Sequence, residues 1–209
     1  MSMEREIFGH LSKALKAYTS NEFRDSLISA KKDFFKITGN LNEEDEDYDL
    51  RMHSFNDWYL MQYCLEDVCR TPISDYILSN NINESVAKVL LDHKHSLFQF
   101  TGDKRNGAAI FRDLKAEKKM MVKDKTIAPM FVKGDIFLAR YFENEGDVLF
   151  MRGVCVIPRQ VKSIVLKELK KVHLAQSKRD EQSLMLKIEY LKTKSLRYSH
   201  IALDKVFSF

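Results

Sequence analysis

The sequence has few cysteines, prolines and glycines, and it has no long run of apolar residues. Its 209 residues include 3 Cys, 3 Pro and 7 Gly. Three cysteines are too few for the disulfide framework that stabilises small secreted domains. We therefore expect Cys64, Cys69 and Cys155 to be reduced and to pack as small apolar side chains. The scarcity of Gly and Pro argues against a long disordered linker. Without a stretch of about 20 apolar residues, we expect no signal peptide and no membrane span, and we predict a cytoplasmic protein in a reducing compartment.

The charges that are present are divided unevenly along the chain. Residues 1–100 contain 11 Lys and Arg and 17 Asp and Glu, a balance of −6, whereas residues 101–209 contain 23 and 13, a balance of +10. Together they give the net charge of +4. This asymmetry indicates either a basic half that meets an anionic partner, or two halves that attract each other within one chain or between chains.

Hydrophobic spacing predicts an α+β protein in three parts. Residues 1–95 show helical spacing and are expected to form an acidic helical subdomain. Residues 96–158 contain short stretches rich in Phe, Ile and Val between turn signals, which predict a small unit of five antiparallel strands, as an open sheet or an SH3- or OB-like barrel. Residues 159–209 return to helical spacing and are expected to form a basic helical pair that packs on the body. The expected helices include 3–18, 21–37, 72–78 after an N-cap at Thr71, and one that starts at Asn81 or Asn83; the expected strands are 96–100, 108–114, 118–123, 135–142 and 147–156.

Six of the eight residues from 42 to 49 are acidic. Mutual repulsion predicts that this run is a solvated loop. The run has neither the glycine nor the alternating oxygen ligands of a calcium-binding loop, so we predict no cation site there.

Aromatic side chains are concentrated in one predicted helix, which contains Phe55, Trp58, Tyr59 and Tyr63. Their spacing is typical of a helix face that packs into a core. On a surface, the same aromatics could stack on a peptide or on nucleic-acid bases. Core packing is therefore the favoured interpretation, and Trp58 and Tyr59 are kept as possible partner-binding residues in the alternative.

Parts of the chain resemble a little-characterised group of bacterial proteins. That group has an F-x-x-W-[FY] helix followed by an R-T-P turn, which here are Phe55–Tyr59 and Arg70–Pro72. It continues with an S-L-F strand and a G-D-[IL]-x-x-A-R strand, which here are Ser96–Phe98 and Gly134–Arg140. The resemblance spans about residues 53–158 and implies the same domain plan. The group has no established activity, and the SEC-C zinc tail of some members is absent here, so the resemblance implies no zinc site.

The sequence contains no recognisable catalytic or metal-binding motif. It lacks a Gly-x-Ser-x-Gly nucleophile elbow and the glycine-rich loops that bind phosphates. His93 and His95 are the closest pair of candidate metal ligands, but side chains at i and i+2 of a helix diverge. The spacing of Cys64 and Cys69 also differs from that of a zinc site. We therefore expect a non-enzymatic protein without metal or cofactor, and keep as an alternative an enzyme whose site is assembled in space.

Basic residues in the second half suggest a polyanion-binding surface. Lysines give general affinity for phosphates through counterion release, and nothing in the pattern indicates readout of bases. A solvated basic face is the alternative. The candidate contacts are Lys104, Arg105, Arg112, Lys118, Lys119, Arg159, Lys162, Lys170 and Lys171.

The leading hypothesis is a binding or adaptor protein that acts through protein–protein contacts or self-association. It depends on the absent catalytic motifs, the aromatic helical half and the opposed charges. The second hypothesis is a nucleic-acid-binding module that uses the β unit and the C-terminal helices. A pocket lined by converging His, Asp or Glu side chains would instead favour an enzyme.

Overall fold

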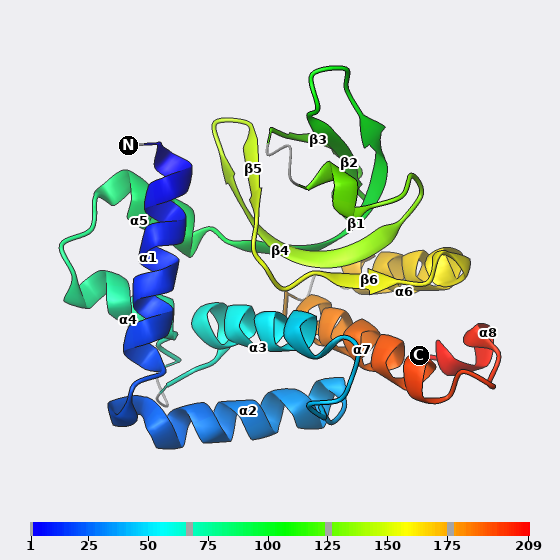
Figure 1. The fold of residues 1–209 in the computed structure, drawn as a ribbon, viewed down its shortest axis with the longest axis horizontal. Coiled ribbons are helices and arrows are strands. Elements are labelled where there is room, and N and C mark those ends of the chain that lie inside the picture. The colour runs from blue at the N-terminus through cyan, green and yellow to red at the C-terminus, as the bar shows by residue number, and fades with distance from the viewer. Residues whose placement is uncertain (1, 66–68, 124–126, 175–177) are drawn as a thin grey trace.

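Between two sets of helices the chain forms one antiparallel sheet, which curls into a half-barrel (Figure 1). The structure is a computed structural model that describes residues 2–65, 69–123, 127–174 and 178–209. The predicted α+β class is confirmed. The strand order is β3-β2-β1-β4-β5, and β6 pairs with β4. The strands are β1 (Lys94–Asp103), β2 (Ala109–Asp113), β3 (Lys119–Val122), β4 (Ile136–Asn144), β5 (Asp147–Phe150) and β6 (Cys155–Ile157).

One predicted strand, 147–156, is interrupted and forms β5 and β6 instead. Between them the amide of Gly153 donates to the carboxylate of Asp57 at 2.7 Å rather than to a neighbouring strand. The pairing of β5 with β4 has already ended at Phe150, apart from a hydrogen bond from the Met151 amide to the Arg140 carbonyl, and the chain rejoins β4 at Cys155.

The helices that follow Thr71 and Asn83 begin at side-chain caps. Thr71 accepts a hydrogen bond from the amide of Ser74, and Pro72 occupies the first helical position, where no amide hydrogen is needed. Asn83 accepts from the amide of Ser85 in the same way. In the described residues, the α-helices before the sheet are α1 (Met3–Tyr18), α2 (Arg24–Thr38), α3 (Tyr48–Gln62), α4 (Pro72–Ser79) and α5 (Glu84–Leu91). Those after it are α6 (Lys162–Leu174), α7 (Lys178–Arg197) and α8 (Leu203–Val206).

The two faces of the sheet carry different cores because alternate strand residues point to opposite sides. On the convex face, Leu97 and Leu138 pack against Val165 of α6 and Ile188 of α7. The core of the concave face is largely aromatic. It contains Phe98, Phe100, Phe111, Phe137, Tyr141 and Phe150.

The N-terminal helices form a third core beside the sheet. Helices α3 and α7 lie between the sheet and α2, while α1, α4 and α5 stand together at one side (Figure 1). Ile7 and Ala14 of α1, Phe34 of α2 and Leu90 of α5 are almost fully buried in this core. The helical half therefore buries apolar surface of its own.

The acidic run contacts the basic half of the same chain. Asp47 forms an ion pair with Lys192 of α7, and Asp45 lies 3.5 Å from both Arg197 of α7 and Arg51 of α3. The prediction of a fully solvated loop is therefore wrong for these two aspartates, whose side chains are only 25% and 12% exposed. Opposite charges draw this part of the run onto α7, although Glu43, Glu44 and Glu46 stay exposed.

Candidate functional site

The turn that joins β2 to β3, residues 114–118, separates two hollows in the surface. Asp113 fixes this turn, because its Oδ1 accepts from the amides of Lys115 at 2.9 Å and Ala116 at 3.0 Å and from the Ser96 hydroxyl at 2.6 Å. Its Oδ2 accepts from the Tyr141 hydroxyl at 3.2 Å. The Lys115 ammonium lies 2.5 Å from Oε2 of Glu181 and so ties the turn to α7. The hydrogen bonds to Asp113 and the ion pair with Glu181 fix the position of this turn, which forms one side of each hollow.

The first hollow, which we name the α6 groove, lies between this turn and α6 and has a volume of ≈ 690 Å³. Its apolar lining consists of Leu114, Ala116, Leu166, Leu169 and Leu174, and its basic lining consists of Arg112, Lys115, Lys162, Lys170 and His173. Glu117 is the one acidic side chain in its described lining. The groove therefore combines an apolar surface with an excess of positive charge.

Three of the predicted polyanion contacts, Arg112, Lys162 and Lys170, come together in the α6 groove. The Lys162 ammonium donates to Oε1 of Gln99 at 2.8 Å, which holds it beside the sheet. Arg112 and Lys170 are exposed and have no ion-pair partner in the part of the chain that the structure describes. These two side chains are therefore free to meet an anionic group.

The other six predicted contacts are not in this groove. Three are already neutralised: Lys118 pairs with Glu143, Arg159 with Asp135 at 2.6 Å and Lys171 with Glu168 at 2.6 Å. The remaining three, Lys104 and Arg105 on the turn between β1 and β2 and Lys119 on β3, are exposed.

The two predicted partner-binding aromatics lie inside the helical core. Trp58 is 9% exposed and Tyr59 is 0% exposed. The Trp58 ring lies 5.2 Å from that of Phe34, and the Tyr59 hydroxyl donates to the carbonyl of Tyr18 at 2.9 Å. Both side chains are on the faces of α3 that pack against α1 and α2, so core packing, the favoured interpretation, describes them, and the alternative of a partner-binding surface is wrong for these two residues.

The second hollow, the β1 cleft, has a volume of ≈ 600 Å³ and lies at the start of β1, on the other side of the same turn. His93, His95, Ser96, Asp113 and Tyr141 line it, together with charged residues at its rim. Burial lowers the pKa of His93 to about 4 and also lowers that of His95, so both imidazoles are neutral at pH 7. Nδ1 of His93 and both ring nitrogens of His95 are buried without a hydrogen-bond partner.

Behind the cleft, a buried ionic cluster joins the sheet to α3 and α7. Arg140 is 0% exposed, and it donates from Nε to Gln62 at 2.9 Å and from Nη1 to Ser54 Oγ at 3.4 Å. Ser54 Oγ lies 3.0 Å from Oε2 of Glu189. Burial raises the pKa of Asp57 to about 7 and raises the pKa of Glu189, while the positive charge of Arg140 opposes both shifts. Sequence reasoning missed this cluster, although a charged residue inside the apolar segment 136–142 was a signal for it.

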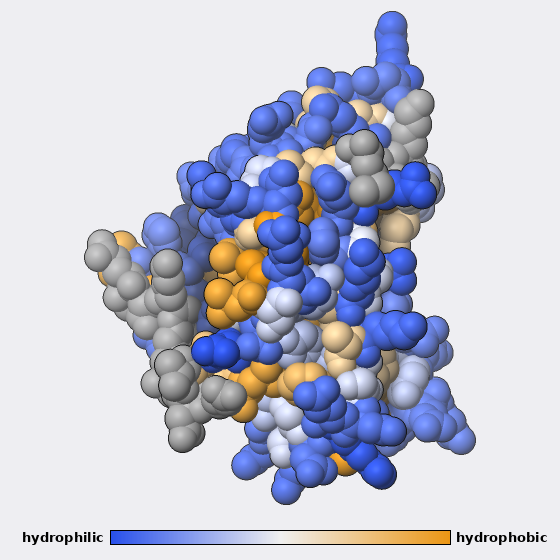
Figure 2. All heavy atoms as spheres, turned by 90° about the vertical axis from the view of Figure 1, so that its left-hand side faces the viewer, coloured by the Kyte–Doolittle hydropathy of each residue, from blue (hydrophilic) through white to orange (hydrophobic). Residues whose placement is uncertain are grey.

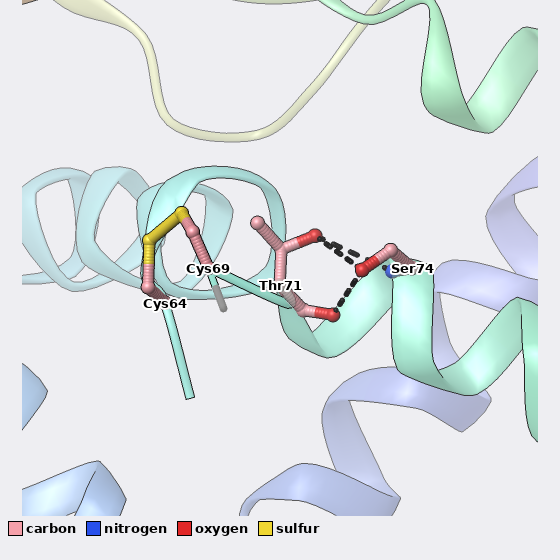
Figure 3. The surroundings of a disulfide bond; sticks show 4 residues. All are labelled: Cys64, Cys69, Thr71 and Ser74. Carbon is pink, nitrogen blue, oxygen red and sulfur yellow. Dashed lines mark hydrogen bonds between the residues drawn. A yellow bond between two sulfur atoms is a disulfide. The ribbon is translucent and has the colours of Figure 1, made fainter. Parts of the chain in front are cut away.

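The cysteine prediction needs one correction. Cys64 and Cys69 form a disulfide that closes the loop between α3 and α4 (Figure 3). The two cysteines are five residues apart, which is close enough for their thiols to meet. A comparison with the spacings of metal ligands does not reveal a disulfide of this kind. Cys155 is a free thiol, and burial raises its pKa to about 12.

Figure 2 shows the face on which α1, α4 and α5 lie, where apolar side chains reach the surface in small groups between hydrophilic ones. Leu78 of α4 is 72% exposed and Leu91, at the end of α5, is 53% exposed. Dispersed groups of this kind are normal on a folded surface.

Among the residues that the structure describes, no three His, Cys, Asp or Glu side chains are grouped so that they could hold a metal ion. No helix in the described ranges has both the length and the apolar composition needed to cross a membrane. No known protein family, curated protein or solved structure matches this chain.

Proposed function

We propose that this protein is a non-enzymatic binding protein whose α6 groove takes an acidic, amphipathic segment of a partner protein. The observation that carries the proposal is the composition of that groove, in which leucines lie beside Arg112, Lys162 and Lys170. An amphipathic helix places apolar side chains on one face and charges around it, and such helices bind in grooves of this kind.

The two kinds of lining residue have different tasks in this proposal. Leu174, which is 82% exposed, and the half-buried Leu166 would cover the apolar face of the partner segment and supply most of the affinity through burial of apolar surface, whereas Leu169 is 6% exposed and belongs to the core beneath the groove. Arg112 and Lys170, which have no other charged partner in the described structure, would attract its carboxylates and set the orientation. Binding should therefore weaken with added salt without being abolished.

A protein segment fits the observations better than a nucleic acid does. Single-stranded nucleic acids bind to exposed aromatic platforms, and Trp58 and Tyr59 are buried. Tyr198 and Phe209 are the exposed large aromatics among the described residues, and neither lines the α6 groove. Three of the nine predicted phosphate contacts are also neutralised by acids of the same chain.

The occupant is expected to come from another molecule. The chain's own acidic run is the obvious candidate within one protomer, but its Asp45 and Asp47 are held at α7 by Arg197 and Lys192. The groove is formed by α6 and the turn at 114–118, and no residue of the acidic run lines it.

The β1 cleft does not supply a competing catalytic proposal, although it brings His93, His95 and Asp113 together. A serine nucleophile needs a base that can take its proton. The hydroxyl of Ser96 is hydrogen-bonded to Asp113 instead of an imidazole, and that same carboxylate also holds the turn at 114–118. The buried ring nitrogens of His95 face no nucleophile in the described structure.

Fluorescence anisotropy with three labelled probes tests the proposal. The first is a peptide of about five helical turns with Leu on one face and Glu elsewhere. The second has the same composition with the leucines scrambled, and the third is a single-stranded oligothymidylate. We expect the amphipathic peptide to bind at least about tenfold more tightly than the scrambled one, a difference of about 1.4 kcal/mol. Equal binding of the two peptides, or tighter binding of the oligothymidylate, would overturn the proposal.

A further inference from the structure

The disulfide between Cys64 and Cys69 lies in an accessible loop between two helices. Cys64 follows the end of α3 by two residues, and Cys69 precedes the start of α4 by three. Cys69 is exposed and Cys64 is half-buried, so thiols in solution can approach the bond from the side of Cys69. The third cysteine, Cys155, is a half-buried thiol, and its raised pKa disfavours the reactive thiolate. The chain therefore carries one accessible sulfur pair and one internal control.

The helices on either side of the disulfide are anchored without it. Trp58 and Tyr59 lie in the last two turns of α3, before Cys64. Their packing in the helical core holds this end of α3 in place. Helix α4 has its own cap in Thr71, which accepts from the amide of Ser74 (Figure 3). Asp75 of α4 accepts from the hydroxyl of Tyr18 at 2.5 Å and from Arg70 at 3.1 Å. Opening the sulfur–sulfur bond therefore leaves both helices in place.

A backbone hydrogen bond keeps the two cysteines close when the disulfide opens. The amide of Leu65 donates to the carbonyl of Arg70 at 2.9 Å. These residues directly follow Cys64 and Cys69, so this bond closes the same loop as the disulfide. Two thiols held this way react with each other as an intramolecular pair, which favours closure of the bond after reduction.

We propose that Cys64 and Cys69 form a reversible redox site that exchanges with low-molecular-weight thiols of the glutathione type. A thiolate attacks Sγ of Cys69, and the sulfur–sulfur bond breaks with its electron pair leaving on Cys64, which takes a proton. A second thiolate attacks the outer sulfur of the mixed disulfide and releases Cys69, which is protonated in turn. Two thiols are oxidised to one disulfide, and two electrons and two protons pass to the cysteine pair. This site is independent of the binding function proposed above.

The test uses the full-length folded protein in glutathione buffers of increasing reduced-to-oxidised ratio. Samples are quenched with iodoacetamide and the labelled positions are identified by mass spectrometry, while far-UV circular dichroism follows the fold. We expect Cys64 and Cys69 to become labelled together as the ratio rises, with Cys155 unlabelled and the spectrum unchanged. Returning the protein to oxidised glutathione should restore the disulfide.

Two results would overturn this proposal. One is a disulfide that stays closed in reduced glutathione until urea unfolds the chain, which is the behaviour of a structural bond. The other is loss of the helical spectrum when the bond opens. As a matched control, Cys155→Ser should leave the redox equilibrium unchanged. Cys69→Ser should abolish closure and leave the half-buried Cys64 as an unpaired thiol on a folded protein.

Discussion

The amide nitrogen of Gly153 lies 2.7 Å from Oδ2 of Asp57, and this hydrogen bond fastens the loop between β5 and β6 to α3. The approach is very close, because a Cβ at position 153 would lie 2.5 Å from the Cα of Ser54 and 2.7 Å from the same carboxylate oxygen. Asp57 is 7% exposed, and burial raises its pKa to about 7. Gly153, which has no side chain, and the buried carboxyl group of Asp57 thus determine how closely the sheet packs against α3.

We predict that Gly153→Ala destabilises the protein by about 2–4 kcal/mol, because the new methyl group would displace the backbone of α3. Urea unfolding followed by circular dichroism measures the change. Gly9→Ala is the matched control, since a Cβ there meets nothing within 4 Å and Gly9 lies inside α1. Alanine should raise stability at that position by about 0.5–1 kcal/mol. A Gly153→Ala protein as stable as the wild type would show that the loop does not rest on α3 in this way.

Asp57→Asn should change the pH dependence of stability. The pKa of Asp57 is about 7 in the folded protein against 3.8 for a free carboxyl, so the folded state binds the proton more tightly. The stabilisation from that proton is full below the unfolded pKa and is lost as the pH rises through 7. The free energy of unfolding of Asp57→Asn, measured relative to that of the wild type, should therefore rise by about 2–3 kcal/mol from pH 5 to pH 8.

Urea unfolding of both proteins at several pH values gives this difference directly. The lowered pKa values of His93 and His95 have the opposite effect, because unfolding exposes them to protons below about pH 6.5, but they are common to both proteins and cancel. Asparagine keeps an acceptor for the Gly153 amide, so the fold is retained. Parallel stability curves for the two proteins would mean that Asp57 titrates in the folded state as it does in water.

The ion pair between Asp47 and Lys192 should stabilise the protein measurably, because their side chains are only 12% and 15% exposed. A double-mutant cycle with Asp47→Asn and Lys192→Met should give a coupling energy of about 1–2 kcal/mol. The control cycle at Glu168 and Lys171, where the lysine is 59% exposed, should give about 0.5 kcal/mol or less. Equal couplings in the two cycles would show that the acidic run does not dock on α7.

The features of the fold that could be predicted from the sequence are those that depend on residues close together in the chain. The cap at Thr71 depends on residues within one helical turn, and β4 was recognisable because its two buried faces give a nearly continuous apolar run within 135–142. The same reasoning could not decide the orientation of Trp58, because i, i+3, i+4 spacing describes a helix face without saying what covers it. The burial of Trp58 depends on α1 and α2, which are distant in sequence.

The candidate site was only partly predictable for a related reason. Arg112, Lys162 and Lys170 were among the predicted contacts, but their meeting in one groove depends on α6 packing against the convex face of the sheet. The leucines of the groove were indistinguishable from core leucines in the sequence. Arg140 was missed because its partners, Gln62 and Ser54, come from α3 and are far away in the chain.

Charge reversal inside and outside the α6 groove decides whether this groove binds an acidic amphipathic segment. The measurement is the affinity of the Leu/Glu amphipathic peptide for Arg112→Glu/Lys170→Glu and for the control Lys104→Glu/Arg105→Glu, which makes the same change in net charge on a different turn. We predict that the groove variant loses about tenfold or more in affinity, equivalent to about 1.4 kcal/mol, while the control stays within about threefold of wild type. Equal losses in the two variants would contradict binding in the α6 groove, because they would mean that the net charge of the protein, and not the groove, attracts the peptide.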